Sequence, residues 1–145
     1  MEIRLLGEVV LVKKFQAVSC VIQNGDRVLM LKRSNKVRTN KGLWSVVAGE
    51  VIGNPLSTAL TEIEEETGLL KNEVTLVKTG EPLVLHLSPN SITILYPFLF
   101  RTEKTDIRLD WEHKEYRWMT LKELARLALV PRFLDMLKSL GLSES

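Results

Sequence analysis

The chain has 145 residues, of which 45% are hydrophobic, and its 20 Lys and Arg against 18 Asp and Glu give a formal net charge of +2 at pH 7. A chain of this length can bury about two thirds of its unfolded surface in one core, so we expect a single domain over residues 1–145. The charge is too small to favour general binding of nucleic acid through electrostatics.

The sequence also argues against a membrane protein and a disulfide-stabilised one. No apolar run approaches the roughly 20 residues needed to cross a bilayer, and residues 1–4 bring charges before any such run begins. Cys20 is the only cysteine and lies in the apolar residues 17–22, where we expect a buried thiol rather than a nucleophile. We therefore expect a cytoplasmic protein without a membrane partner.

The N-terminal third of the chain is rich in short runs of β-forming residues. These runs predict strands at residues 3–6, 9–12, 15–22, 27–32 and 42–47. Asn24-Gly25 favours a tight hairpin turn between the third and fourth strands. The edges of the first two strands could pair with a second copy of the chain in a homodimer.

A basic segment lies between the last two of these strands and predicts a surface loop. Five cations occur within ten residues without an intervening acid: Lys32, Arg33, Lys36, Arg38 and Lys41. Their charges could simply complement the acidic helix that follows in the sequence. We favour a phosphate clamp, in which Arg33 and Arg38 grip phosphate oxygens through bidentate contacts. Lys36 and Lys41 would add further positive charge to that clamp.

Residues 55–67 predict a helix, because both of its ends are marked. Asn54 can cap the first free N–H groups, Pro55 suits the first helical position, and Gly68 supplies the left-handed residue that ends the helix. At about 100° per residue, the apolar side chains share one arc that should face the core: Leu56, Ala59, Leu60 and Ile63.

The same helix carries an excess of carboxylates. Glu62, Glu65 and Glu66 fall on another arc at i, i+3 and i+4, while Glu64 points elsewhere. With no Lys or Arg in residues 54–68, each like-charged pair should cost roughly 0.2–0.5 kcal/mol on an exposed helix. Either this arc is a solvated acidic face, or its oxygens bind a hard divalent cation, Mg²⁺ or Mn²⁺, together with a phosphate substrate.

Gly49 and the run from Glu62 to Leu69, Glu-Ile-Glu-Glu-Glu-Thr-Gly-Leu, resemble the Nudix box. The core of that box reads Arg-Glu-(apolar)-x-Glu-Glu-x-Gly-(apolar) after an upstream glycine. The core matches at every position but one, because Thr61 stands in place of the arginine. Gly49 is also two residues closer to Glu62 than the family pattern places its glycine, and no acidic residue occupies the place of the upstream box glutamate.

The resemblance implies the Nudix fold, an α/β/α sandwich with a mixed β-sheet. It implies hydrolysis of a diphosphate linkage in a nucleoside diphosphate joined to another moiety, with Mg²⁺ or Mn²⁺ held by Glu62, Glu65 and Glu66 and by a backbone carbonyl near Gly49. In the family the arginine mainly orients a glutamate, so its loss concerns the rate more than metal binding. The alternative is a Nudix-like module that senses a nucleotide or a partner without hydrolysing it.

The resemblance leaves the substrate open. ADP-ribose, dinucleoside polyphosphates, nucleotide sugars, damaged nucleoside triphosphates and capped RNA ends all fit a diphosphate site. Nucleic acid is therefore expected only as a 5′ end that serves as substrate.

The second half of the chain predicts strands at residues 74–78, 82–87 and 92–101. Pro97 lacks a ladder donor and predicts an edge, a bulge or a break in the last of them. A capping box at Thr120 and Glu123 predicts a helix to about residue 127, and Pro131 predicts the start of another that Gly141 ends. Apolar stripes should place these helices on the sheet: Leu121, Leu124 and Ala125, then Phe133, Leu134, Leu137 and Leu140.

Residues 110–119 resemble a second landmark of the family, an acidic or histidine-bearing loop that leads into a strand ending in tryptophan. Members of the family differ in their general base, since some use a box glutamate and others a glutamate from this loop. Glu112 and Glu115 are therefore candidates for the base alongside Glu65. A solvated loop carboxylate is the alternative interpretation for either of them.

Overall fold

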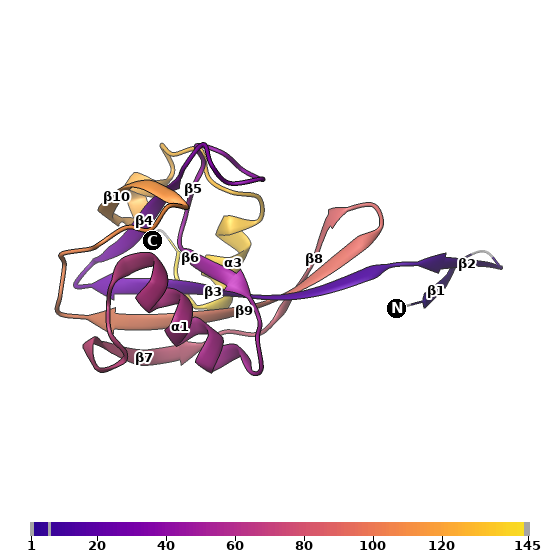
Figure 1. Cartoon of the computed structure of the whole chain (residues 1–145), viewed down its shortest axis with the longest axis horizontal. Helices are drawn as coiled ribbons and strands as arrows, with labels where there is room; N and C mark the ends of the chain where they lie inside the picture. Colours follow the sequence, from indigo (N-terminus) through magenta and orange to yellow (C-terminus); the bar gives the residue numbers. More distant parts are fainter. Residues whose placement is uncertain (1, 6, 144–145) are drawn as a thin grey trace.

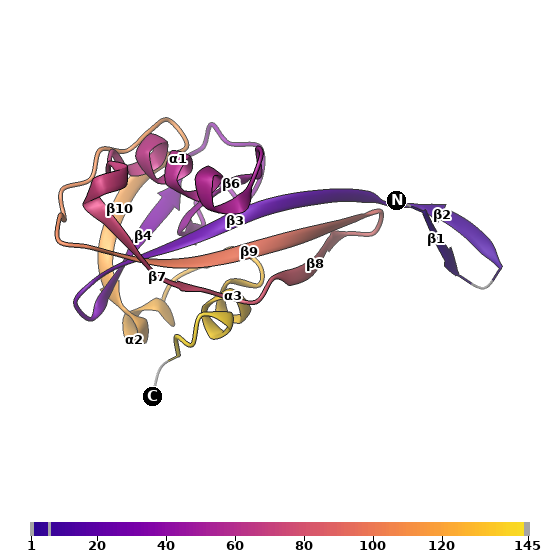
Figure 2. The same ribbon diagram turned by 90° about the horizontal axis from the view of Figure 1, so that it is seen from below.

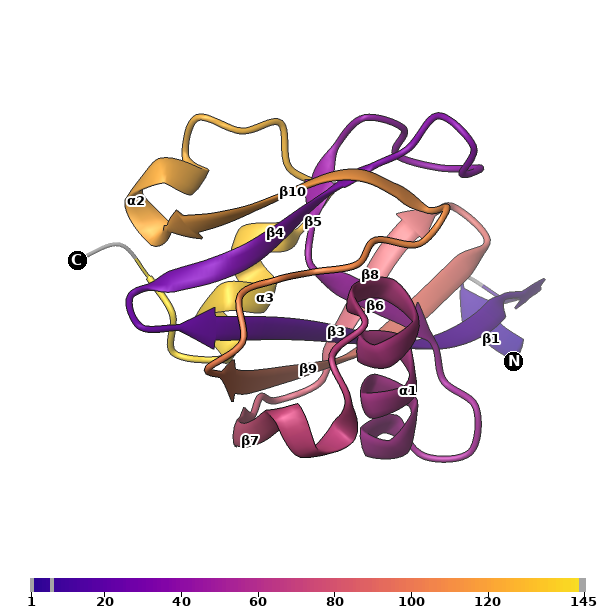
Figure 3. The same ribbon diagram turned by 60° about the vertical axis from the view of Figure 1, so that its left-hand side comes forward.

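The computed structural model describes residues 2–5 and 7–143. Eight of its strands form one sheet, in which β10, β4, β3, β9 and β7 follow one another, while β5 pairs with β4, β6 with β3 and β8 with β9 (Figure 3). Their bounds are β3 (Lys13–Asn24), β4 (Arg27–Arg33), β5 (Trp44–Ser45), β6 (Val47–Glu50), β7 (Val74–Thr79), β8 (Leu83–Ser88), β9 (Ser91–Thr102) and β10 (His113–Thr120). The sheet is mixed, because β3 and β9 are parallel and the other pairs are antiparallel.

Helices cover both faces of this sheet. Figure 2 shows α1 (Pro55–Thr67) on one side and α2 (Leu121–Leu124) with α3 (Phe133–Ser139) on the other. Alternate residues of β3 face the two helical layers: Cys20 and Ile22 pack with Ile63 of α1, and Val21 packs with Met136 of α3. The predicted sandwich is confirmed.

The central hairpin also matches the expectation from sequence. β3 and β4 pair through Gln23 with Val28 and Asn24 with Arg27. Gly25 in the turn has a φ of 62°, which a glycine adopts without the steric cost that other residues meet. This hairpin carries the chain directly into the basic segment.

The strand predicted over residues 42–47 is wrong in its extent. The structure has two short strands there instead, because the chain changes partner at Val46. Its first part, β5, pairs with Leu31 and Lys32 of β4, and its second part, β6, pairs with residues 17–20 of β3. This change of partner brings Gly49 to the face of the sheet that α1 covers.

Pro97 does not interrupt β9, which runs continuously and pairs with β3 through Ser19. The break lies in the strands beside it, since β8 pairs with β9 only as far as Leu95 and the pairing of β7 with β9 begins at Phe98. The Pro97 carbonyl accepts from Gly80 N at 2.9 Å in the segment between β7 and β8. On this side of β9, Pro97 lies between the pairing with β7 and the pairing with β8, so its lack of an N–H group costs no ladder hydrogen bond.

The helices agree with the predictions in part. α1 has the expected bounds, and Ala59 and Ile63 are fully buried, but Leu56 at its start is 39% exposed. α2 ends at Leu124 rather than near residue 127, and Leu134 on α3 is 57% exposed instead of packing on the sheet. The predicted apolar faces of these helices are therefore wider than the faces that are buried in the structure.

The N-terminal strands stand apart from the rest of the molecule. β1 (Glu2–Leu5) and β2 (Glu8–Leu11) form a separate two-stranded sheet within the part of the chain that the structure describes, and they project beyond the long β3 strand (Figure 1). None of the helices in residues 2–5 and 7–143 has both the length and the hydropathy of a membrane span.

Candidate functional site

Local interactions place α1 and its carboxylates. Asn54 Oδ1 accepts from Ser57 N at 2.9 Å, and Gly68 ends the helix with a φ of 76° while its N–H donates to Glu64 O. Thr58 Oγ1 bonds to both the N–H and the C=O of Ile52 at 2.9 Å, which ties the preceding loop to the first turn. The short loop from β6 is thus anchored to the helix start.

The three box glutamates, which were predicted to share one arc of the helix, differ in burial. Glu65 is exposed, Glu62 is partly buried, and Glu66 is only 1% exposed. Glu66 Oε1 lies 3.7 Å from His113 Nε2, whereas Oε2 has no hydrogen-bond partner among the described residues. Burial, followed by the neighbouring Glu62 carboxylate, raises the pKa of Glu66 to about 11.

Glu62 fits against Gly49 of β6. A Cβ atom on Gly49 would stand 2.7 Å from both Glu62 Cγ and Oε1, so only glycine leaves room for this carboxylate. Burial raises the pKa of Glu62, and the charges of Glu65 and Asp110 raise it further. The structure therefore brings Gly49, Glu62 and Glu66 together, with Glu65 next to them on the exposed side of the helix.

The loop before β10 adds carboxylates to this cluster. The pKa of Glu112 is raised by burial and by the charges of Asp110 and Glu62, while Arg33 lowers it. Asp110 Oδ1 accepts from Glu112 N at 3.2 Å and lies 3.1 Å from His113 Nδ1. Glu112 is thus placed beside the helix carboxylates, as a candidate base should be.

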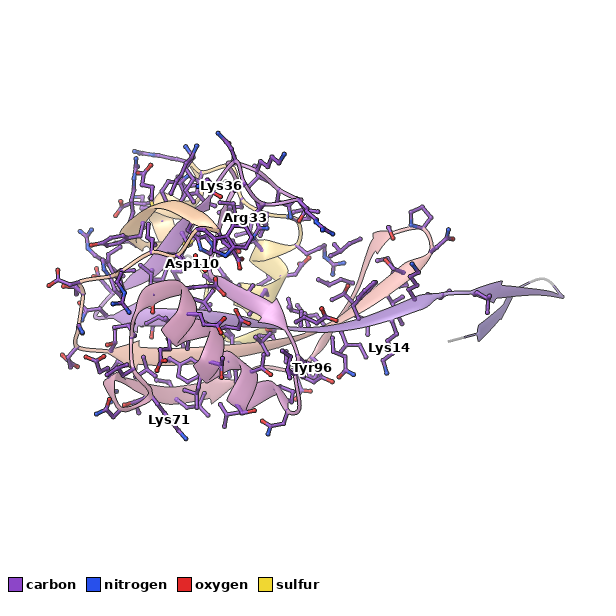
Figure 4. All side chains as sticks on the ribbon, viewed as in Figure 1. Lys14, Arg33, Lys36, Lys71, Tyr96 and Asp110 are labelled. Atoms are coloured by element: carbon purple, nitrogen blue, oxygen red, sulfur yellow. The ribbon has the colours of Figure 1, made fainter. Side chains whose placement is uncertain are left out.

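Arg33 is the basic residue that the structure ties most closely to these carboxylates. Its charge acts on both Glu112 and His113. In Figure 4, Arg33 and Asp110 lie above α1, and Lys36 lies further out on the loop after β4. Arg33 Nε donates to Thr39 O at 3.1 Å, and its Nη groups make no hydrogen bond within residues 2–5 and 7–143.

The other basic candidates, Lys36, Arg38 and Lys41, are exposed on the same loop. Ser34 joins this loop to the acidic one, because its N–H donates to Glu112 O at 2.7 Å and its hydroxyl donates to Trp111 O at 2.9 Å. The basic and acidic loops therefore form one rim beside α1.

Glu115 is not brought to this cluster. Its Oε2 accepts from Arg117 Nε at 2.7 Å, and the Arg117 guanidinium lies 5.2 Å from the Trp44 ring, which belongs to the core cluster beneath α2 and α3. A register shift between His113 and Glu115 accounts for this placement, since one extra residue turns the following side chains to the opposite face.

Asp110 and His113 were not predicted as residues of the site. Both were read only as parts of an acidic loop, yet the buried His113 ring lies between Asp110 and Glu66. The spacing of Asp110 three residues before His113 was visible, but only the folded chain brings the pair to α1.

The donor set fits a hard divalent cation. Glu66 Oε2 is a buried carboxylate oxygen without a partner, and the Glu62 carboxylate lies next to it against Gly49. No three His, Cys, Asp or Glu side chains of the described residues already stand in ligating positions. Mg²⁺ needs no such cage, because it commonly takes one or two protein carboxylates and completes its shell with water and phosphate.

The position of Glu65 and Glu66 on α1 further disfavours their negative charges. Glu65 and Glu66 occupy the last turn, where the helix dipole is negative, and that turn contains no basic residue. Carboxylates are disfavoured there by about 0.3–1 kcal/mol each when exposed. A bound cation would offset this dipole cost, the mutual repulsion and the burial of Glu66.

Residues 13–140 match the sequence model of the NUDIX domain, and the chain therefore belongs to this family. An asymmetrical bis(5′-nucleosyl)-tetraphosphatase from Mus musculus is 31% identical to it over 77 residues, which make up 52% of each protein. The chain thus spans about half the length of this curated relative.

Solved structures agree with this assignment. The MutT protein of Methanosarcina mazei Go1 superposes with a TM-score of 0.70 and 25% identity, covering 88% of this chain and 92% of that one. The Caenorhabditis elegans Ap4A hydrolase, solved as a binary complex, gives a TM-score of 0.71 at 20% identity, covering 88% and 95%. The latter similarity shows that the fold is shared.

We expect the cation-free protein to lose stability as the pH rises. Folded Glu66 keeps its proton to a pH of about 11, whereas the ordinary pKa is 4.5, so between these values the folded state binds more protons than the unfolded state. The loss from this one group is at most about 1.4 kcal/mol per pH unit. Thermal unfolding in EDTA from about pH 5 to about pH 9 measures it.

The matched variant is Glu66→Gln, which has a similar shape but does not ionise. Glu112 keeps its raised pKa in this variant, whereas the pKa of Glu62 loses the lowering effect of its hydrogen bond with Glu66, so the difference between the two pH profiles reports Glu66 together with its coupling to Glu62. We expect a flatter profile for the variant. Equal slopes for the two proteins would contradict the assignment of a buried, protonated Glu66.

Proposed function

We propose that this chain is one domain that hydrolyses a diphosphate linkage in a nucleoside diphosphate joined to another moiety, with Mg²⁺ or Mn²⁺ as its cofactor. The observation that carries the proposal is the buried Glu66 carboxylate, which has one oxygen without a partner and lies against Glu62. A buried carboxylate without a compensating partner is costly unless a cation or a proton neutralises it.

Glu62, Glu65 and Glu66, with a backbone carbonyl near Gly49, would hold the cation. When bound there, it would polarise the phosphoryl oxygens and lower the pKa of a bound water. The chain itself would supply the surrounding charges. Arg33 donates to Thr39 O through Nε, and its two Nη groups would bind phosphate oxygens in bidentate fashion.

Glu112 is the preferred general base among the three candidate glutamates, Glu65, Glu112 and Glu115. Its pKa is raised by burial and by Asp110, which makes it a stronger base than an ordinary exposed carboxylate. Glu62 and Glu65 are assigned to the cation, and Glu115 is paired with Arg117 on the other face of the sheet. Glu112, in the loop before β10, would therefore remove the proton from the attacking water.

The first substrates to test are dinucleoside tetraphosphates, because the name of the mouse relative indicates this class. Both product nucleotides and released phosphate should be measured, since cleavage at different anhydride bonds gives different products. The other classes named from sequence, such as ADP-ribose and nucleotide sugars, belong in the same panel.

A second candidate is a module that binds such a nucleotide without hydrolysing it. Thr61, which replaces the box arginine, is exposed, and no three-donor group is assembled in the described part of the chain. Binding of a dinucleoside tetraphosphate in the presence of Mn²⁺, without product over many hours, would establish this alternative over hydrolysis.

Removal of a single cation-binding carboxylate should abolish most activity. We expect Glu62→Gln, Glu65→Gln and Glu66→Gln each to lower kcat by at least about a hundredfold, equivalent to roughly 2.7 kcal/mol of barrier, while the fold is kept. Glu64→Gln is the control, because Glu64 is an exposed neighbour on the same helix. If Glu64→Gln lowers kcat as much as the other three variants, the assignment is wrong.

The two loop glutamates should respond differently. Glu112→Gln should reduce kcat by about 10²–10⁴-fold, the usual contribution of a general base, and should remove the acidic limb of the pH–rate profile, which reflects protonation of that base. Glu115→Gln should leave kcat within about threefold of wild type, because it breaks only a surface ion pair. If Glu115→Gln lowers kcat more than Glu112→Gln does, Glu115 is the general base instead.

Arg33 should contribute mainly to substrate binding. We expect Arg33→Ala to raise KM at least about tenfold, since the loss of a charge-assisted pair costs roughly 1.5–3 kcal/mol, and Arg33→Lys to restore only part of this loss. Steady-state kinetics on the best substrate of the panel give both constants. An unchanged KM in Arg33→Ala would exclude the clamp at this residue.

We also propose that β1 and β2 pair with a second copy of the chain. A two-stranded hairpin is marginally stable alone, and within the described residues these strands bond only to one another. Sedimentation velocity should show a dimer for the full chain and a folded monomer after deletion of residues 1–11. A monomeric full chain would contradict the pairing.

A further inference from the structure

Ser34 is the buried residue at which the basic segment meets the loop that carries Glu112. Its exposed fraction is only 7%, so water does not readily replace the bonds that it makes. Its N–H donates to Glu112 O at 2.7 Å, and its hydroxyl donates to Trp111 O at 2.9 Å. The same hydroxyl accepts from Lys36 N at 3.2 Å, which leaves its hydrogen for Trp111. Ser34 therefore uses both its backbone and its side chain to hold one short stretch of the acidic loop.

The carbonyls that Ser34 binds belong to the two peptide groups on either side of the Glu112 Cα atom. Asp110 holds the opposite ends of these two groups, because its Oδ1 accepts from Glu112 N at 3.2 Å and its carbonyl accepts from His113 N at 3.4 Å. Each peptide group is planar, so bonds at both of its ends fix its orientation. Two fixed planes on either side of the Cα atom set the direction of the Glu112 Cα–Cβ bond.

The direction of this bond matters because Glu112 is the proposed base and Arg33 the proposed clamp. Burial raises the pKa of Glu112, and the nearby charge of Arg33 lowers it, so the two side chains interact. Arg33 directly precedes Ser34 and is fixed by bonds of its own: its N–H donates to Leu43 O at 2.9 Å, and its Nε donates to Thr39 O at 3.1 Å. Ser34 thus joins a fixed clamp to the backbone that carries the base.

We propose that Ser34 is a positioning residue for the general base: by holding the peptide groups on both sides of Glu112, it sets the direction of the Glu112 carboxylate relative to Arg33. This inference rests on the proposed function, because it takes Glu112 as the base. Ser34 touches neither substrate nor cation and transfers no proton. It acts through the placement of Glu112, and a misplacement of about 1 Å can cost roughly a hundredfold in rate.

Ser34→Ala removes the hydroxyl and keeps the backbone bond to Glu112 O. The carbonyl of Trp111 then loses its partner, and the peptide group before Glu112 is free to tilt. Ser139→Ala is the matched control, because the Ser139 hydroxyl donates to Met136 O at 2.7 Å on α3, which lies on the other face of the sheet from α1 (Figure 2). Each variant removes one hydroxyl-to-carbonyl bond, so a merely structural role of Ser34 predicts similar effects for the two.

Steady-state kinetics on the best substrate of the panel are the first measurement. We expect Ser34→Ala to lower kcat about ten- to hundredfold and to change KM less than about threefold, because Arg33 keeps its own bonds. Ser139→Ala should keep both constants within about twofold of wild type, since it changes nothing beside the carboxylates. An unchanged kcat in Ser34→Ala, or an equal loss in Ser139→Ala, would overturn the positioning role.

A double-mutant cycle shows whether Ser34 acts through Glu112. In the Glu112→Gln background no base remains to be positioned, so the added Ser34→Ala substitution should lower kcat by less than about twofold. A loss as large as that in the wild-type background would mean that Ser34 acts on something other than the base, which contradicts the proposal. If Ser34→Ala does not fold, Ser34→Cys replaces it with the same outcomes, because a thiol forms only weak hydrogen bonds.

Amide hydrogen exchange in EDTA gives a readout that needs no activity. Ser34→Ala should speed exchange at Glu112 N and His113 N at least about fivefold, because the loop that holds these two amides is loosened. Ser139→Ala should leave both rates as they are in wild type. Wild-type exchange at both amides in Ser34→Ala would show that the hydroxyl does not hold the loop, and the positioning role would be wrong.

Wild type and Glu112→Gln distinguish this inference from the proposed function. If wild type hydrolyses no nucleotide of the panel, both fail. If wild type is active and Glu112→Gln is equally active, the assignment of the base and this inference fail, while the hydrolase and its cation site stand. If Glu112→Gln loses activity and Ser34→Ala does not, the positioning role alone fails.

Discussion

The burial of one carboxylate, Glu66, is the constraint on which the rest of the site depends. It lies in the last turn of α1, beside Glu62, with one oxygen facing His113 and the other without a partner in the described part of the chain. Burial, repulsion and the helix dipole all disfavour its charge, and a bound divalent cation would reverse all three. In the cation-free protein, burial and the neighbouring carboxylates raise the pKa of Glu66 to about 11, so a proton neutralises it instead.

The fold supplies what this carboxylate requires. The parallel pair of β3 and β9 forms the centre of the sheet, and α1 packs on it through Ile63. The change of partner between β5 and β6 places Gly49 against Glu62, where a larger residue would displace the carboxylate. Hydrogen bonds from Ser34 join the basic and acidic loops into one rim. Charges of both signs are therefore held beside one end of the helix.

Local patterns in the sequence predicted α1 well, because Asn54, Pro55 and Gly68 act on the residues next to them. The hairpin at Gly25 was predicted for the same reason. What could not be predicted depends on distant contacts: the burial of Glu66 rather than Glu65, and the approach of His113 to α1. The face occupied by Glu115 depends on a register shift in β10 that the sequence does not mark.

The central claim is that the unpartnered oxygen of Glu66 is a ligand of a divalent cation. Anomalous diffraction from crystals soaked in Mn²⁺ tests it most directly, because the signal locates the metal independently of any assay. We predict a peak about 2.1 Å from Glu66 Oε2, with a Glu62 oxygen nearby. A structure in which Mn²⁺ binds elsewhere, while Glu66 stays buried without a new partner, would contradict the account.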